Sequence, residues 1–325
     1  MVKRLSTRYG KSSGLKLVLA FSVIILILAL CPQFLPRFFV YLLALILISG
    51  LQATSLNVAL GYGGMYQFHH AVFFGIGAYT VSIMLMKTDL PPVLSFLAGP
   101  MVAALLGFVM GLICVRLSKL YFGMLQLSLG SLVWIVVFRW YSFTGGDDGL
   151  HGVPVPSLIS SVNGSYYFAL ITSIVSLFMM YVILNSPFGR ILQAIRDNPE
   201  RSEGVGIRVK LHQLVTQVIA AFFAGVAGVL FVTVEGSAFP DLLSWTLSLE
   251  FIIMCLLGGW FTFLGPMLGA AMIVSLRTLV GVYTEYWTSA LAVILMLLIF
   301  FLPEGALGYF QRFSPTPDHS PSEDK

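Results

Sequence analysis

Charge is scarce in this sequence. Only 10% of its 325 residues are Asp, Glu, Lys or Arg, whereas 58% are hydrophobic. A soluble globular domain carries roughly a quarter of its residues as charges, so this chain cannot cover its surface with polar side chains and lipid must solvate most of it. No polar stretch is long enough to form a soluble domain. The composition therefore predicts an all-α, polytopic membrane bundle over residues 17–308.

Three chemical signatures are also missing. The chain has three cysteines, an odd number without metal-ligand spacing, which argues against a disulfide framework and a zinc site. It has no G-x-x-x-x-G-K-[ST] phosphate loop, so it is not expected to bind ATP in that way. No nucleophile–base pair is apparent, and a membrane enzyme built on His69, His70 and Glu250 is the weakest interpretation. We expect no enzyme activity, no cofactor and no metal.

What the sequence has instead is a series of apolar segments, and a helix needs about 20 such residues to cross a bilayer. The third and eighth segments are short, so we expect broken or re-entrant helices there, shielded by their neighbours. Eight spans would fit the sequence as well as ten. The ten candidates are 17–35, 38–58, 69–86, 93–115, 120–140, 165–184, 212–234, 243–257, 260–281 and 287–302.

Basic residues set the expected orientation, because Lys and Arg concentrate in cytoplasmic loops. With the N-terminus inside, 14 of the 18 Lys and Arg residues fall on the cytoplasmic side. The four exceptions are Arg37, Lys87, Arg139 and Arg277. Both chain ends are thus predicted to be cytoplasmic: a basic N-terminal segment, 1–16, and a polar, proline-rich tail, 309–325, which we expect to be disordered.

The longest charged segment, 185–213, is predicted to form two short cytoplasmic helices. Ile191, Leu192 and Ile195 recur at helical spacing, and Asp197-Asn198-Pro199 breaks the first helix and caps the second. In the second helix, Glu200 and Glu203 are expected in the first turn, where carboxylates suit the helix dipole. Gly204 and Gly206 would end it. The pair is interpreted as a docking knob for a partner, and the alternative is an amphipathic pair resting on lipid headgroups.

Residues 61–80, GYGGMYQFHHAVFFGIGAYT, place helix-breaking and polar residues inside an apolar chain. Gly61, Gly63 and Gly64 are expected to unwind the helix, and broken helices at membrane depth commonly line a solute path. Gln67, His69 and His70 would face that path. The alternative is that the histidines simply form hydrogen bonds between helices. The small residues Gly75, Gly77 and Ala78 are expected to pack against a neighbouring helix or subunit.

Two further acidic features are candidates. Glu250 is a lone charge in an apolar run, so it must be paired, protonated or near an interface. Both a pathway role and a helix-anchoring role remain open for it, with anchoring favoured. In TGGDDGLHG, Asp147 and Asp148 lack the spacing of a calcium loop. We interpret this segment as a structured external loop that contacts a solute-delivering protein, with a plain turn as the alternative.

Four stretches in series resemble permease subunits of ABC importers for branched-chain amino acids, over about 40–308. They are GYGGMYQFHHAVFFGIGAY, FTGGDDGLHGVP, SPFGRILQAIRDN with SEGVGI, and SLEFIIMCLLGGWFTFLGPMLGA. The sequence departs from the family at 66–70, where only His70 matches the usual Leu-Ser-Leu-Gly-His. It departs again at Trp260 and Phe261, where small residues are usual.

This resemblance implies a bacterial inner-membrane permease subunit that forms half of a translocation pathway. Its partners would be two cytosolic ATPase subunits, a second permease chain or copy, and a periplasmic or lipid-anchored binding protein. Branched-chain or other hydrophobic amino acids are the implied substrates. Alternatives are urea or short amides, and an ion-coupled secondary transporter. The implied ATPase-coupling residues are Arg190, Arg196, Asp197, Glu200, Glu203, Gly204 and Gly206, and the candidate pathway residues are Gly63, Gly64, Gln67, His69, His70 and Glu250.

Overall fold

The computed structural model describes residues 25–117, 119–259 and 261–283, with Val23 and a few isolated positions between 289 and 296. Four predictions lie wholly or largely outside the described residues. They are the N-terminal segment 1–16, the start of the first span, the last span 287–302, and the tail 309–325. Trp260 also lies outside them.

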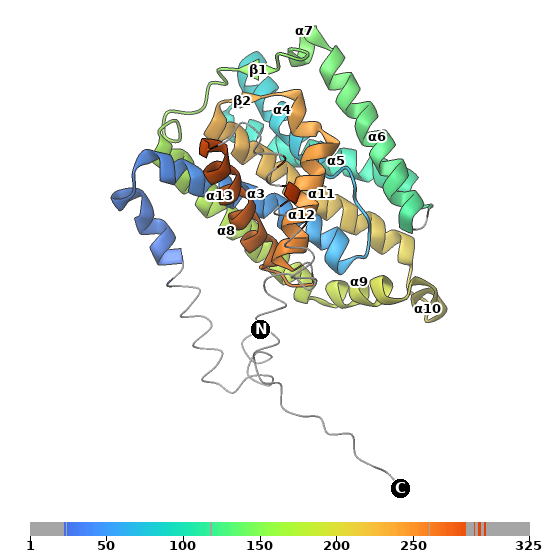
Figure 1. Ribbon diagram of the computed structural model, residues 1–325. Helices are drawn as coiled ribbons and strands as arrows, with labels where there is room; N and C mark the ends of the chain where they lie inside the picture. The colour runs from blue at the N-terminus through green and yellow to red at the C-terminus, as the bar shows by residue number, and fades with distance from the viewer. Residues whose placement is uncertain are drawn as a thin grey trace.

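The described chain is almost entirely helical (Figure 1), which confirms the predicted all-α, polytopic bundle. Within it, five apolar helices are long enough to cross a membrane. They are α3 (Arg37–Asn57) continued by η1 (Val58–Tyr62), α5 (Pro92–Cys114), α6 (Lys119–Arg139), α8 (Val162–Asn185) and α11 (Val209–Glu235). The shorter apolar helices are Ile25–Phe34, α4 (Ala71–Lys87), α12 (Trp245–Gly258) and α13 (Gly265–Tyr283).

Helix α11 is the centre of the bundle, where it packs against α5, α4, α3 and α8. Two thirds of its apolar stretch (67%) is buried, compared with 33% for α5 and 28% for α6. Since membrane helices associate by close packing rather than by the hydrophobic effect, the buried fraction identifies which helices form the core. Helices α5 and α6 therefore lie at the periphery, with most of their apolar side chains on the outer surface of the bundle.

Small residues hold α4 against α11. A Cβ atom on Gly77 would lie 2.6 Å from the Cα of Gly225, so the two backbones are in contact. The predicted packing of this small-residue face is confirmed for Gly77. Gly75 instead packs against Leu243 in the short helix η2 (Pro240–Leu243), which joins α11 to α12.

The two polar ends of the bundle are formed by different loops (Figure 1). The amphipathic α9 (Pro187–Asp197) and α10 (Pro199–Gly204) lie at one end. At the other end lie α7 (Tyr141–Thr144) and the antiparallel strands β1 (Leu150–His151) and β2 (Ser237–Ala238). The segments predicted to be cytoplasmic and external are therefore at opposite ends, although the side that each faces stays a prediction.

Candidate functional site

The helix is broken between α3 and α4, as the glycines predict. Helix α3 passes into the π-helix η1, and the chain is then non-helical until α4 begins at Ala71. Gly64 adopts φ 65°, a conformation that L-residues with a side chain rarely take. A Cβ on Gly63 would lie 2.7 Å from the carbonyl oxygen of Ala59. The break thus depends on glycine both for its backbone conformation and for space.

The side chain of His69 links this break to two other elements. Its Nδ1 lies 3.1 Å from the carbonyl oxygen of Leu127 in α6, and its Nε2 lies 2.6 Å from that of Leu243 in η2. A neutral imidazole donates from only one nitrogen, so both contacts are hydrogen bonds only when the ring is doubly protonated. The His69 side chain is 1% exposed.

His70 and Gln67, two other predicted pathway residues of this segment, are also buried. His70 Nε2 lies 3.0 Å from Ser55 Oγ, and the following amide, that of Ala71, donates to Ser248 Oγ at 2.8 Å. Gln67 is fully buried. The two histidine contacts favour the alternative that these side chains hold helices together, and a role in a solute path stays a prediction.

Replacing His69 with alanine is expected to lower the stability of the bundle. The change removes the contacts of the imidazole with the carbonyl oxygens of Leu127 and Leu243. We expect this loss to lower the free energy of unfolding by on the order of 1–3 kcal/mol. We expect the melting temperature of the purified protein in detergent to fall by several degrees. His151→Ala, a change to an exposed histidine whose side-chain hydrogen bond is to the carbonyl oxygen of Asp148 in its own loop, should leave the melting temperature unchanged. An unaltered melting temperature with slowed transport would instead support the pathway interpretation.

Helices α9 and α10 form where the sequence predicts them. The Asn198 side chain accepts a hydrogen bond from the amide of Arg201 at 2.9 Å and so caps α10, and Gly206 turns the chain with φ 88°. One detail of the prediction is wrong. Glu200 lies in the first turn of α10, but Glu203 lies near its last residue, because the helix has only six residues.

The apolar stripe of α9 faces the protein itself. Leu192 and Ile195 are fully buried within the chain, which leaves little apolar surface for lipid. The opposite face is polar and exposed, and a polar face suits a protein partner better than the acyl boundary of a membrane. The exposed candidates for coupling are Arg190, Asp197, Glu200, Glu203, Gly204 and Gly206.

Arg196, by contrast, points into the bundle. Its Nη1 donates to the carbonyl oxygen of Gly61 at 2.9 Å, at the end of η1, and its guanidinium lies 5.1 Å from the ring centre of Phe261. A Cβ on Gly64 would lie 2.8 Å from Arg196 Cγ, so only glycine allows α9 this close. The Asn57 side chain donates to the carbonyl oxygen of Thr262 at 3.1 Å. A single arginine of α9 therefore contacts two membrane breaks, the one at 61–64 and the non-helical residues 261–264 between α12 and α13.

Glu250 is paired with Arg277, which the sequence marked only as a basic residue on the external side. Arg277 Nη1 in α13 lies 3.6 Å from Glu250 Oε1 in α12. Among the three states expected for this carboxylate, the structure shows the paired one, and the pair joins two neighbouring helices. Glu250 also lines a cavity, so anchoring and a pathway role do not exclude each other.

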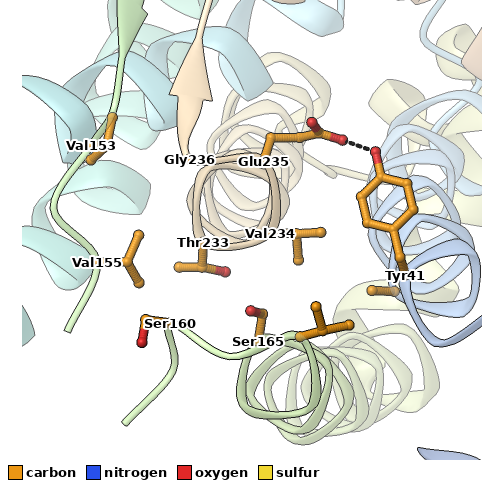
Figure 2. Close-up of a pocket in the computed structure, with 11 residues that line it drawn as sticks. Tyr41, Val153, Val155, Ser160, Ser165, Thr233, Val234, Glu235 and Gly236 are labelled. Atoms are coloured by element: carbon orange, nitrogen blue, oxygen red, sulfur yellow. Dashed lines mark hydrogen bonds between the residues drawn. The ribbon is translucent and has the colours of Figure 1, made fainter. Parts of the chain in front are cut away.

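The pair lines the larger of two neighbouring cavities. This cavity has a volume of about 1130 Å³ and is lined by residues of α3, α4, α11, η2, α12 and α13. The smaller, of about 290 Å³, lies between α3, the start of α8 and the end of α11 (Figure 2). Tyr41 and Glu235 line both, and the Tyr41 hydroxyl donates to the Glu235 carboxylate (Figure 2). Neither residue stood out in the sequence, because an acidic residue at the end of an apolar helix is unremarkable there.

The TGGDDGLHG segment is an ordered loop rather than a plain turn. Strand β1 pairs with β2 beyond α11, and the amide of Val153 donates to the carbonyl oxygen of Gly236 at 3.0 Å. The Tyr141 hydroxyl donates to Asp147, which raises the pKa of the Tyr141 phenol. Asp147 and Asp148 are exposed. The pairing with β2 connects this loop to Glu235 and the two cavities.

Comparison with known proteins agrees with this arrangement. The family model described as the permease component of the branched-chain amino acid transport system matches residues 38–302. The high-affinity branched-chain amino acid transport system permease protein LivM of Escherichia coli (strain K12) is 27% identical over 321 residues, covering 88% of this chain and 74% of that protein. A probable branched-chain amino acid transport permease protein LivM of Methanocaldococcus jannaschii is 25% identical over 311 residues, covering 78% of this chain and 88% of that protein.

No solved structure matches the chain. The family match, however, spans most of its length and contains every element described above from α3 onward. The structure also contains the features that the sequence led us to expect, namely the apolar helices, the break after α3 and the paired helices α9 and α10. This multi-pass membrane protein belongs to the family of permease components of branched-chain amino acid transport systems, which are transport proteins and not enzymes.

Proposed function

We propose that the chain is one permease subunit of a bacterial ABC importer and forms half of a pathway for branched-chain or other hydrophobic amino acids. The names of its relatives support this substrate class. The observation that carries the proposal is the attachment of α9 to the membrane breaks by Arg196. Helix α9 has a polar exposed face and is hydrogen-bonded to the point where a transmembrane helix is unwound. It is therefore suited to transmitting movement from a partner to that helix.

Energy would come from two cytosolic ATPase subunits, because the sequence lacks a phosphate loop. They dock on the exposed polar face of α9 and α10, which carries Arg190, Asp197, Glu200 and Glu203. When the ATPase subunits close on ATP, α9 moves, and Arg196 pulls on the carbonyl of Gly61. The unwound segment shifts, α3 and α4 tilt, and access alternates between the two sides.

Two further partners bind other surfaces of the bundle. A periplasmic or lipid-anchored binding protein delivers solute to the ordered loop that contains Asp147 and Asp148. A second permease chain or a copy of this one supplies the other half of the pathway, against the apolar faces that the bundle leaves exposed. Both chain termini lie in the cytoplasm of the cell, and the chain lies in the inner membrane.

The double substitution Glu203→Arg with Gly204→Glu tests ATPase docking. Both positions are exposed, and a side chain at Gly204 would meet no atom within 4 Å, so the fold should survive. Glu203→Arg reverses the charge at one position of the docking face, and Gly204→Glu adds a long charged side chain beside it. Together they should abolish both uptake and the solute-stimulated ATPase activity of the assembled importer, with membrane insertion unchanged. Asp89→Asn, a change to an exposed residue between α4 and α5, is the control. Undiminished uptake by the double variant would point to an ion-coupled transporter.

A further inference from the structure

The larger cavity has the size and the wall of a small-molecule site. Its volume of about 1130 Å³ is slightly above the usual range of about 300–1,000 Å³ for ligand pockets, and such pockets are mainly apolar with a few placed polar groups. Aromatic and aliphatic side chains form most of its wall, among them Phe38, Ile48, Phe74, Phe231, Phe239 and Phe251. An apolar wall of this kind suits a hydrocarbon side chain.

The charged groups of the cavity are of both signs. Three carboxylates, those of Glu235, Asp241 and Glu250, line it together with the guanidinium of Arg277. Ionisable groups within a membrane domain are costly and usually serve a function. An apolar cavity that offers acceptors for an ammonium group and a fork of donors for a carboxylate matches both ends of a zwitterion.

The existing contacts of these groups can be exchanged. The closest distance between Arg277 and Glu250 is 3.6 Å, longer than a good charged hydrogen bond, and the Arg277 side chain is 50% exposed. Arg277 and Tyr41 both line the cavity. Tyr41 in turn donates to Glu235, so the basic and acidic groups lie around one space.

We propose that this cavity binds an aliphatic α-amino acid as a zwitterion. Arg277 takes the α-carboxylate, Glu235 takes the α-ammonium group, and the aromatic wall takes the side chain. The inference rests on the proposed function and adds the substrate's recognition site to it. The solute enters past the Tyr41–Glu235 contact, which borders the smaller cavity beside the ordered external loop (Figure 2).

The test measures leucine uptake, with its KM, in vesicles that contain the complete importer. Arg277→Gln alone would leave Glu250 without this partner, so the informative variant is Glu250→Gln with Arg277→Gln, which removes the ion pair and keeps the charge balanced. We expect the KM for leucine to rise about tenfold or more, because a hydrogen bond to a charged group is lost. Glu235→Gln should act in the same direction. Arg139→Gln, at the exposed end of α6 and outside the cavity, should leave the KM unchanged.

A second measurement separates recognition from a structural role. Competition by 3-methylbutylamine, which is leucine without its carboxylate, should be weak against the native importer. In the double variant, competition by 3-methylbutylamine should become stronger relative to competition by leucine, because the guanidinium that binds the carboxylate of leucine has been removed. A native KM and native selectivity in both the double variant and Glu235→Gln would overturn the proposal while leaving the proposed function intact. If the native importer moves no leucine at all, the proposed function fails first.

Discussion

Replacing Arg196 with alanine is expected to cut uptake at least about tenfold in an importer that still assembles. The change removes the 2.9 Å hydrogen bond to Gly61 and the contact with Phe261. A charged hydrogen bond contributes about 1.5–3 kcal/mol and a cation–π contact about 0.5–2 kcal/mol. If these contacts transmit movement of α9 to the unwound segment, a loss of this size uncouples ATP use from transport.

The measurement compares uptake with ATPase activity in the same vesicles. Arg196→Ala also removes the 3.0 Å ion pair with Asp197. The other charged residues of the docking face, Arg190, Glu200 and Glu203, are unchanged, so the ATPase subunits should still copurify and hydrolyse ATP, with less solute moved per ATP. Arg196→Lys keeps the positive charge without the guanidinium fork and should be intermediate. Arg116→Ala, an exposed arginine between α5 and α6, is the matched control. If ATPase subunits no longer copurify with Arg196→Ala, this residue acts in docking, and normal uptake would refute any role in coupling.

Replacing Gly77 with leucine is expected to prevent the bundle from forming. The nearest atoms to a new Cβ are backbone atoms of Gly225, at 2.5 and 2.6 Å, and backbone cannot turn aside as a flexible side chain can. Helices α4 and α11 would have to separate, which breaks the central contact of the core. A cost above about 4 kcal/mol is consistent with overpacking at such a site.

Size-exclusion chromatography in detergent and thermal melting would show this loss directly. Gly77→Leu should give aggregated or degraded protein, and Gly77→Ala should give a smaller decrease in stability. Gly281→Leu is the control, since a Cβ at this position of α13 meets no atom within 4 Å. A monodisperse Gly77→Leu protein with the native melting temperature would mean that α4 and α11 do not cross at these glycines.

Much of the fold could be predicted because its signals are local. Apolar runs of sufficient length define membrane helices, and eight of the ten predicted spans match helices with ends that differ by a few residues. Proline, asparagine and glycine likewise marked the boundaries of α9 and α10. The position of Glu203 was wrong because α10 begins at Pro199, so Glu203 is its fifth residue and lies beyond the first turn of about 3.6 residues.

The residues that the polar side chains contact could not be predicted. Arg196 and Gly61 are 135 residues apart, and Tyr41 and Glu235 are 194 apart. In a membrane protein, the face that packs on other helices is about as apolar as the face that meets lipid, so hydropathy does not tell which way a residue points. His69 illustrates this, because its burial between α6 and η2 depends on elements far along the chain.

The sequence alone determined that this chain is a membrane protein, which residues form its helices, and at which residues those helices break. Those properties depend on the solvation of apolar side chains and on the backbone preferences of glycine and proline, which act over a few residues. Only the tertiary structure decided that Arg196 of α9 contacts the break after α3, and that carboxylates and an arginine from α11, η2, α12 and α13 line one cavity. Both features arise when helices distant in sequence pack closely, and no local preference encodes that packing.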